Sequence, residues 1–295
     1  MLTAVISDLH LGTRTETDLL GRPEVRSRLV DRLGAADEVV LLGDSIELRD
    51  RPLADALAVA TPFFEELGEA MSGRRVTLVP GNHDHHLGSE WLLRRGEQPL
   101  RLEQRALPAP GDPLARLARR MGDTRLELAY PGVWLAPDVY ATHGHFLDCH
   151  RDVRTFECLA RAVSERILRR GGYATPDDYE AVLAPLYRLL YRTAQWSWAW
   201  QAVRLGKAVL RRVERADARE SRFLPGMRAM ARVVKTLGIE ADHVVFGHLH
   251  HPGEWTSDGG TRFINTGTWR ASNAVAACAL VRGVGPPELS FPLLG

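Results

Sequence analysis

The sequence has little cysteine and no long apolar run. The three cysteines, Cys149, Cys158 and Cys278, lie far apart and form no Cys-x-x-Cys pair, which argues against a disulfide framework and a thiolate metal site. The best apolar stretch, residues 274–281, is much shorter than the roughly 18 residues that a membrane-spanning helix needs. Residues 2–6 have no basic stretch before them and no small-residue cleavage site after them, so we expect no signal peptide. Together these absences predict a soluble, cytoplasmic protein with reduced thiols.

Lysine is also scarce, because Lys207 and Lys235 are the only lysines in the chain. The positive charge is therefore almost entirely guanidinium, which suits phosphate and carboxylate recognition, although genome composition explains it equally well. The net charge of +1 hides an uneven distribution: residues 151–235 hold eighteen Arg or Lys against nine Asp or Glu, about +9, and the remainder is about −8. An apolar content of 45% and a charged content of 25% are those of a globular protein.

The first third of the chain alternates between apolar runs and segments with helical spacing. Residues 2–7, 38–42 and 76–80 each fit a buried strand, and residues 23–33 and 52–70 between them fit helices. This alternation predicts an α/β fold with a parallel sheet and helices on its faces. After an irregular stretch, we expect further strands at residues 125–130, 133–135, 139–142, 243–246, 262–265, 274–281 and 288–291.

Residues 150–237 have a different pattern, in which apolar residues recur every three or four positions. We expect this segment to be a helical insert within a single domain that covers residues 1–295. It contains Trp196, Trp198 and Trp200, followed by basic residues at 204, 207, 211, 212 and 215. The simpler interpretation is helix packing with a solvated basic face. The other is a lid over the active site that contacts a phosphorylated lipid, a nucleotide or an anionic membrane surface.

Polar residues that can bind metals follow the ends of five expected strands. Because loops at the carboxyl ends of parallel strands meet in one crevice, we expect these side chains to converge. Their carboxylate, amide and imidazole groups suit a pair of divalent cations, and such a pair needs an anionic bridging ligand, for which Asp44 is the natural choice. The clusters are Ser7-Asp8-Leu9-His10, Gly43-Asp44, Gly81-Asn82-His83-Asp84, Thr142-His143-Gly144-His145 and Gly247-His248-Leu249-His250.

The order of these clusters resembles the calcineurin-like metallophosphoesterase family. The matching residues are Asp8-x-His10, Gly43-Asp44, Gly81-Asn82-His83-Asp84, His143-Gly144 and Gly247-His248-x-His250, with the turn Asn265-Thr266-Gly267-Thr268 near the end. Each motif alone is weak, but five motifs in the right order, each after an apolar strand, are specific. The resemblance implies a four-layer α-β-β-α sandwich, with two packed sheets between helices. It also implies one metal held by Asp8, His10, Asp44 and His250, and a second held by Asp44, Asn82, His143 and His248.

The implied ligand set supports a mechanism that needs no Ser or Cys nucleophile. Two bound ions would supply a hydroxide for in-line attack on phosphorus and would polarise the phosphoryl oxygens. His83 resembles a family histidine beside the metal shell; we expect it to protonate the leaving oxygen, with Asp84 or Glu47 holding its tautomer. His145 and His251 flank ligands and are candidates for contacts to substrate or to those ligands. Mn²⁺ is the first expectation for the metal, and Fe, Zn²⁺, Ni²⁺ and Mg²⁺ suit the same ligands.

The substrate is less constrained, because a metal pair of this type cleaves monoesters, diesters and pyrophosphates. The sequence Gly43-Asp44-Ser45-Ile46-Glu47-Leu48-Arg49 departs from the Gly-Asp-x-x-Asp-Arg-Gly of protein phosphatases in the superfamily, which weakens that assignment. The Gly-Asp-x-x-Glu pattern, the opening Ser7-Asp8-Leu9-His10-Leu11 and the insert resemble bacterial UDP-diacylglucosamine pyrophosphohydrolases. Those enzymes usually carry arginine at the position of His83 and have a shorter insert, so we treat them as relatives.

We therefore expect a phosphodiesterase or pyrophosphohydrolase that acts on a phosphorylated small-molecule or lipid-linked substrate. A phosphomonoesterase is the alternative. A nuclease is also open: the basic insert would bind the phosphates of a nucleic acid, and cleavage would depend steeply on salt. The same insert would allow peripheral membrane contact. A non-catalytic scaffold is disfavoured, because the ligand set is complete.

Overall fold

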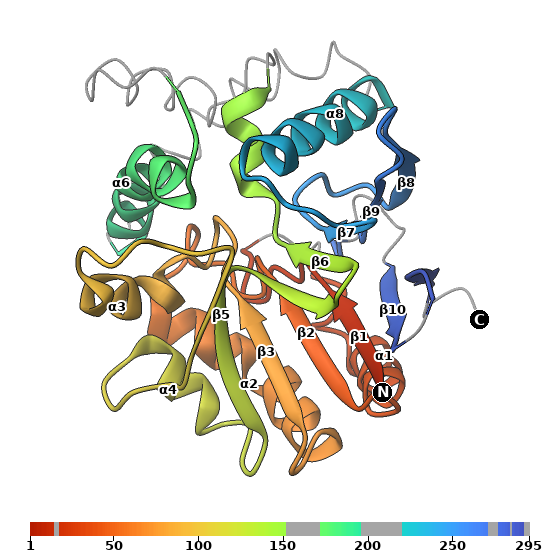
Figure 1. The fold of residues 1–295 in the computed structure, drawn as a ribbon. Helices are drawn as coiled ribbons and strands as arrows, with labels where there is room; N and C mark the ends of the chain where they lie inside the picture. The colour runs from red at the N-terminus through yellow and green to blue at the C-terminus, as the bar shows by residue number, and fades with distance from the viewer. Residues whose placement is uncertain (15–17, 152–171, 196–219, 271–276, 284, 292–295) are drawn as a thin grey trace.

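The computed structural model describes residues 1–14, 18–151, 172–195, 220–270, 277–283 and 285–291 (Figure 1). Its N-terminal part alternates strands and helices: β1 (Leu2–Ile6), α1 (Pro23–Leu33), β2 (Glu38–Leu42), α2 (Leu53–Ala70), β3 (Arg75–Val79), α3 (His86–Arg95), β4 (Glu103–Ala106) and α4 (Pro113–Ala118). The three strands and two helices predicted in the first third of the chain are confirmed, with ends that agree to about one residue. Helices α3 and α4 and strand β4 lie in the stretch that has no regular pattern in the sequence.

The rest of the chain contains β5 (Arg125–Ala136), β6 (Val139–Thr142), the 3-10 helix η1 (His145–His150), α6 (Pro176–Ala194), α8 (Glu220–Thr236), β7 (His243–Phe246), β8 (Gly253–Thr256), β9 (Arg262–Asn265), β10 (Cys278–Arg282) and β11 (Glu288–Ser290). One prediction is wrong here, because residues 125–130 and 133–135 belong to the single strand β5. Pro131 lies where β5 changes partners: it pairs with Glu103 of β4, and Gly132 already pairs with Thr142 of β6. Proline cannot donate to a strand ladder and is tolerated at such a change.

The strands form one hydrogen-bonded path that passes from one half to the other through β5. The first half has the order β11-β10-β1-β2-β3-β5, and the second continues as β5-β6-β7-β9-β8, with β4 paired to β5 beside the path. Strands β1, β2, β3 and β5 run parallel in the first half, as do β6, β7 and β9 in the second. Antiparallel strands lie at the outer ends, where β10 pairs with β1 and β8 pairs with β9. The sheet is therefore mixed, with parallel strands at the centre of each half.

Three apolar clusters separate four layers of structure. The first cluster packs the first half of the sheet against α1, α2 and α4, and it includes Val39 and Leu41 of β2. The second includes Val40 and Leu42 of the same strand together with Ile264 of β9, so it lies between the two halves of the sheet. The third packs the second half against η1, α6 and α8 (Figure 1). Because both faces of β2 are buried, its sequence is a continuous apolar run. The predicted four-layer α-β-β-α arrangement is confirmed.

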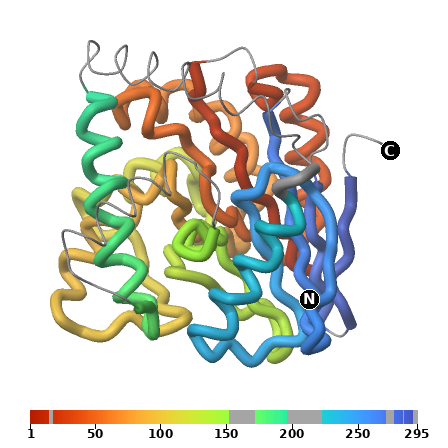
Figure 2. Tube along the Cα trace, turned by 90° about the horizontal axis from the view of Figure 1, so that it is seen from above, coloured from red at the N-terminus to blue at the C-terminus, as the bar shows by residue number. Residues whose placement is uncertain are grey.

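Helices α6 and α8 both lie in the segment 150–237, for which the sequence predicts a helical insert. Both contribute to the third cluster, α6 through Tyr179 and Leu183 and α8 through Met230. Seen from above, η1 lies between these two helices (Figure 2). Residues 196–200 and the basic positions 204–215 lie outside the described residues, so the lid interpretation and the single-domain expectation stay predictions. No helix in the described ranges is long and apolar enough to cross a membrane.

Candidate metal centre

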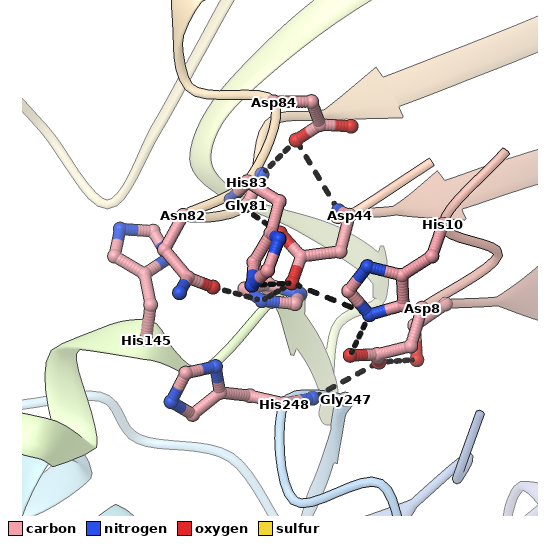
Figure 3. Close-up of polar contacts among 12 residues, drawn as sticks. Asp8, His10, Asp44, Gly81, Asn82, His83, Asp84, His145, Gly247 and His248 are labelled. Atoms are coloured by element: carbon pink, nitrogen blue, oxygen red, sulfur yellow. Dashed lines mark hydrogen bonds and ion pairs between the residues drawn. The ribbon is translucent and has the colours of Figure 1, made fainter. Parts of the chain in front are cut away.

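The structure brings together the loops that follow β1, β2, β3, β6 and β7, and their polar side chains point toward one another (Figure 3). Among the described residues, the non-glycine residues with a positive φ are all predicted ligands. Their φ angles are 55° for Asp8, 50° for His10, 52° for Asp44, 68° for His248 and 57° for His250. Residues with side chains rarely adopt this backbone conformation, and such strain concentrates at functional sites. The loops therefore adopt this unusual backbone conformation at the positions of predicted ligands.

Glycines of the motifs leave the room that these ligands occupy. A Cβ atom on Gly81 would overlap the carboxylate of Asp44, and one on Gly247 would overlap the carboxylate of Asp8. The two chain segments therefore approach the ligands more closely than any other residue type allows. Packing against the carboxylates therefore explains why glycine precedes Asn82 and His248, in addition to the match with the family motifs.

The first group of ligand atoms comes from Asp8, His10, Asp44 and His250, and these atoms all lie within 4.8 Å of one another. Nε2 of His250 is 3.0 Å from Oδ1 of Asp8 and 3.2 Å from Nε2 of His10. Nε2 of His10 is also 3.9 Å from Oδ2 of Asp44. The structure thus collects the residues that the resemblance assigns to the first metal.

The second group consists of Asp44, His143 and His248, again with ligand atoms within 4.8 Å of one another. Oδ1 of Asn82 joins them: it lies 3.1 Å from Nε2 of His143, and 3.2 Å from both Nδ1 of His248 and Oδ2 of Asp44. Asp44 is the residue that belongs to both groups. Its carboxylate therefore stands where a bridge between two cations would have to stand.

The side chains of the two groups are better matched to cations than to one another as hydrogen-bond partners. Oδ1 of Asp8 is buried, and although Nε2 of His250 lies 3.0 Å away, no donor among the described residues makes a well-directed hydrogen bond to it. The amide oxygen of Asn82 faces a carboxylate oxygen and the ring nitrogens of two histidines, and only the opposite orientation would turn the amide N–H donors toward them. With the oxygen turned inward, every group offers a lone pair to the same space. Oxygen and imidazole ligands of this kind suit divalent cations.

The electrostatics of the site show the same excess of negative charge. Burial by itself raises the pKa of Asp8, but the neighbouring His250 outweighs it and lowers the pKa to about 2. Burial lowers the pKa of His143, yet the carboxylates of Asp44 and Asp8 raise it to about 10. The carboxylates therefore attract positive charge strongly, and metal binding would have to displace a proton from the imidazole.

Three of the imidazoles predicted to bind metal each have an acceptor at the ring nitrogen that points away from the ligand groups. Nδ1 of His10 is 3.1 Å from Oε2 of Glu47, and Nδ1 of His143 is 3.0 Å from the carbonyl oxygen of Leu42. Nε2 of His248 is 2.9 Å from Oδ2 of Asp148, a buried residue of η1. In each case the other ring nitrogen faces the ligand group. Such partners fix the tautomer and the orientation of metal-binding histidines.

His83 lies beside the ligand groups, with its Nε2 3.9 Å from Oδ2 of Asp44. Of the two carboxylates proposed to hold its tautomer, Glu47 is the partner, because both of its oxygens are 2.8 Å from Nδ1 of His83. Burial lowers the pKa of His83 to about 3, and the guanidinium of Arg49 adds to this against the opposing charge of Glu47. Glu47, His10 and His83 also form a third group with metal-binding geometry. Because both rings direct Nδ1 to Glu47, we interpret this group as an orienting contact.

Asp84 has a different place from the one predicted. Its carboxylate accepts hydrogen bonds from the backbone N–H groups of Gly81 at 2.7 Å, Ser45 at 2.7 Å and Asp44 at 3.2 Å. These contacts join the loop after β2 to the loop after β3, so the carboxylate of Asp84 holds these backbones and not the ring of His83. Burial and the charge of Asp44 raise the pKa of Asp84 to about 6.

Several residues near the site have no role in the sequence analysis. Asp148 could have been suspected as a carboxylate shortly after a ligand, but nothing in the sequence pairs it with His248. Tyr187 and Glu180 come from α6, far from every motif in the sequence.

Of the two histidines that flank ligands, His145 is buried, with Nε2 3.2 Å from the hydroxyl of Tyr130. The other, His251, is exposed.

A family model and several solved structures match this chain. Residues 1–252 match the family model described as calcineurin-like phosphoesterase. A solved dimetal phosphatase from Danio rerio is 14% identical, with 99% of this chain and 96% of that chain covered and a TM-score of 0.46. An archaeal phosphodiesterase is 12% identical over 98% and 100%, with a TM-score of 0.39, and the phosphopantetheinyl hydrolase of Mycobacterium tuberculosis is 16% identical over 92% and 90%, with 0.35. The search of curated proteins found no match.

The solved structures are too distant to bear on the substrate. The family model is decisive for the family, because it runs from the first strand through the last ligand motif. The buried Asp and His groups supply the site that the family motifs imply. This chain therefore belongs to the calcineurin-like phosphoesterase family and is a metallophosphoesterase.

Proposed function

We propose that the protein is a phosphodiesterase or pyrophosphohydrolase that works with two divalent ions, of which Mn²⁺ is the first candidate. The observation that carries this proposal is the position of Asp44, which belongs to both buried ligand groups. When bound, two such ions supply a nucleophilic water at neutral pH and neutralise charge on the phosphoryl oxygens. The proposed substrate is a phosphorylated small molecule or a lipid-linked ester.

The ligands divide between the ions as the two groups divide in space. We assign Asp8, His10 and His250 to one ion, and Asn82, His143 and His248 to the other, with Asp44 shared. Glu47 and Asp148 hold the imidazoles of His10 and His248 with one nitrogen turned inward. This backing keeps the lone pairs of the imidazoles directed at the ions before substrate arrives.

His83 is the proposed proton donor to the leaving oxygen. Its Nδ1 is held by Glu47, and its Nε2, which lies 3.3 Å from NH1 of Arg49 and 3.9 Å from Oδ2 of Asp44, is the atom on the side of the ligand groups. The lowered pKa means that the resting imidazole is neutral. The negative charge of a phosphoryl group beside Nε2 favours the protonated ring, so in this proposal His83 takes up a proton from solvent as the substrate binds and passes it to the leaving oxygen. His83 is thus a catalytic residue in this proposal, whereas Glu47 is a positioning residue.

The proposal against a protein phosphatase is supported by the same carboxylate. In the sequence Gly-Asp-x-x-Glu, Glu47 stands where protein phosphatases of the superfamily have aspartate, and here it holds both His10 and His83. The departure from the protein phosphatase motif therefore has a structural use in this chain. No contact among the described residues favours a nucleic acid, and the basic segment that would bind one, or a membrane, lies largely outside them.

A panel of esters and metals tests this proposal. Purified protein would be loaded with Mn²⁺, Fe²⁺, Zn²⁺, Ni²⁺ or Mg²⁺ and assayed on bis(p-nitrophenyl) phosphate, p-nitrophenyl phosphate and a nucleotide pyrophosphate. We expect the diester or the pyrophosphate to be cleaved with the higher kcat/KM. Faster cleavage of the monoester would show a phosphomonoesterase instead, and no cleavage by protein with both ions bound would overturn the enzymatic proposal.

A further inference from the structure

A cavity of about 350 Å³ lies where helices α2, α3, α4 and α6 meet. Figure 1 shows α3, α4 and α6 together along one side of the molecule. The wall of the cavity includes Pro52 before α2, His86 of α3, Pro113 and Arg116 of α4, and Tyr191 of α6. Among the described residues that line it, none is a predicted metal ligand. Its size and its mixture of apolar and polar groups are those of a small-molecule site, which measures about 300–1,000 Å³ in other proteins.

The cavity lies next to the side of the metal centre that holds the proposed proton donor. His86 follows His83 by three residues, so their Cα atoms are less than about 11 Å apart. Pro52 follows Arg49 by three residues, and NH1 of Arg49 is 3.3 Å from Nε2 of His83. Because His83 is the residue proposed to protonate the leaving oxygen, the cavity is on the leaving-group side of the reaction.

Two aromatic rings of the wall form a stacked pair. The ring centres of His86 and Tyr191 are 3.7 Å apart, and the ring planes are inclined by 21°. Oγ of Ser89 lies 3.0 Å from Nδ1 of His86, which orients the imidazole and leaves Nε2 for another partner. Burial lowers the pKa of His86 to about 4, and the charges of His85 and Arg116 add to this, so the ring is neutral at pH 7. The pair therefore offers uncharged ring surface and two polar edges.

Arg116 and Gln195 add groups to the wall that suit a planar, polar ring. The positive charge of Arg116 acts on the pKa of both His86 and Tyr191, so its guanidinium lies near the pair. A guanidinium is planar and stacks on the faces of aromatic rings. The side-chain amide of Gln195 donates to the carbonyl oxygen of Tyr191 at 3.2 Å, and its own oxygen is left as an acceptor. The wall thus combines flat surfaces with hydrogen-bond donors and acceptors.

We propose that this cavity binds a nucleobase in the leaving group of the substrate, with the base against the His86–Tyr191 pair and Arg116. This inference rests on the proposed function, and it narrows the substrate class to esters or pyrophosphates of a nucleoside. Proteins hold single bases by stacking them on aromatic side chains or guanidinium planes and by hydrogen bonds to the base edges. The wall presents each of these groups. A cavity of this size fits one base and not the successive bases of a strand.

Binding of nucleoside monophosphates to the Mn²⁺-loaded protein tests the assignment without turnover. The ligands for titration are AMP, GMP, CMP and UMP, each compared with ribose 5-phosphate, which has the same phosphate and sugar but no base. We expect at least one nucleotide to bind about 10- to 100-fold more tightly than ribose 5-phosphate, which is the contribution of one stacked base.

Substitutions in the cavity should remove the contribution of the base alone. We expect Tyr191→Leu and Arg116→Gln each to weaken nucleotide binding by about 10-fold, with both ions retained and ribose 5-phosphate bound as by wild type. Tyr191→Phe keeps the ring and should retain most of the preference for the nucleotide. Arg116 is exposed, so Arg116→Gln keeps the test decisive if Tyr191→Leu does not fold. The matched control is Arg119→Gln, at an exposed position that ends the same helix.

The outcomes separate this inference from the function on which it rests. The inference fails if wild type binds all four nucleotides no more tightly than ribose 5-phosphate, or if Arg116→Gln and a folded Tyr191→Leu keep the full preference. If wild type then still cleaves a phosphate ester, the proposed function stands. If wild type binds two ions and prefers a nucleotide but cleaves no ester or pyrophosphate, the proposed function fails together with the leaving-group role, whereas the assignment of the cavity to a base holds.

Discussion

Oδ2 of Asp148 lies 2.9 Å from Nε2 of His248, so the other ring nitrogen of His248 faces the amide oxygen of Asn82 and the carboxylate of Asp44. We predict that Asp148→Asn weakens binding of the second metal ion by about 10- to 100-fold, because an acceptor behind a ligand imidazole fixes its tautomer and raises its basicity. Titration of the metal-free variant with Mn²⁺ measures this. The control is Asp123→Asn at an exposed position, which should bind both ions normally. Equal affinities for Asp148→Asn and wild type would contradict the prediction.

Separate substitutions of His83 and Glu47 distinguish a role in catalysis from a role in metal binding. For His83→Gln we expect kcat to fall by about 10²- to 10⁴-fold with metal content near wild type, because a proton donor is lost and no ligand is. Glu47→Gln should lower both activity and metal affinity, since Glu47 also holds the ligand His10 at 3.1 Å. Metal content by elemental analysis, measured beside the kinetics, distinguishes these outcomes. Unchanged turnover by His83→Gln would remove the histidine from the mechanism.

Glu180 supplies a stability contribution that depends on pH. Burial by itself raises its pKa, but the contacts with His85 and Tyr130 outweigh burial and lower the pKa below 4.5. A carboxyl group whose pKa is lower in the folded protein stabilises fully above its unfolded pKa, and this stabilisation is lost as the pH falls through the folded value. We therefore expect Glu180→Gln to cost about 1–3 kcal/mol of unfolding free energy at pH 7.

Denaturant unfolding at several pH values checks this expectation. The difference between wild type and Glu180→Gln should be constant near neutral pH and shrink below about pH 4.5, where the wild-type carboxylate begins to take up a proton. Glu69→Gln, at an exposed position of α2, serves as the control and should leave stability unchanged at every pH. A difference in unfolding free energy that grows as the pH falls would contradict the prediction.

Gly81 tests whether close packing of the loops is needed for metal binding. A Cβ atom there would overlap the carboxylate and the backbone nitrogen of Asp44. We expect Gly81→Ala to lose most of its metal affinity, because the shared ligand must move. Gly259→Ala is the matched control, since its Cβ would meet only Oγ of Ser257, at 3.8 Å. Isothermal titration with Mn²⁺ compares the two variants, and similar affinities would show that the loop can adjust.

The sequence predicts which polar side chains gather at the site, because each follows an apolar strand closely. A run such as residues 38–42, buried on both faces, ends at Gly43-Asp44, so the position of Asp44 at the edge of the sheet follows from local pattern alone. The same reasoning places Asn82 after β3 and His143 after β6. The fold class and the loops of the site can therefore be predicted from the sequence.

The side-chain contacts around the ligands could not be predicted in this way. The contact between Glu180 and His85 joins residues 95 positions apart, and that between His248 and Asp148 joins residues 100 positions apart. No local periodicity encodes such pairs, because they depend on how η1 and α6 pack on the second half of the sheet. For the same reason the sequence does not decide between Asp84 and Glu47 as the partner of His83, whereas in the structure the carboxylate of Asp84 turns to the backbone of the preceding ligand loop.

The central claim is that Asp44 joins two metal sites, and metal stoichiometry tests it most directly. Metal-free protein would be titrated with Mn²⁺, with circular dichroism to confirm that each variant is folded. We predict two equivalents for wild type, one for Asp8→Asn, which removes a ligand of a single site, and neither at wild-type affinity for Asp44→Ala. One equivalent or none in wild type, or two equivalents at wild-type affinity in Asp44→Ala, would contradict the account.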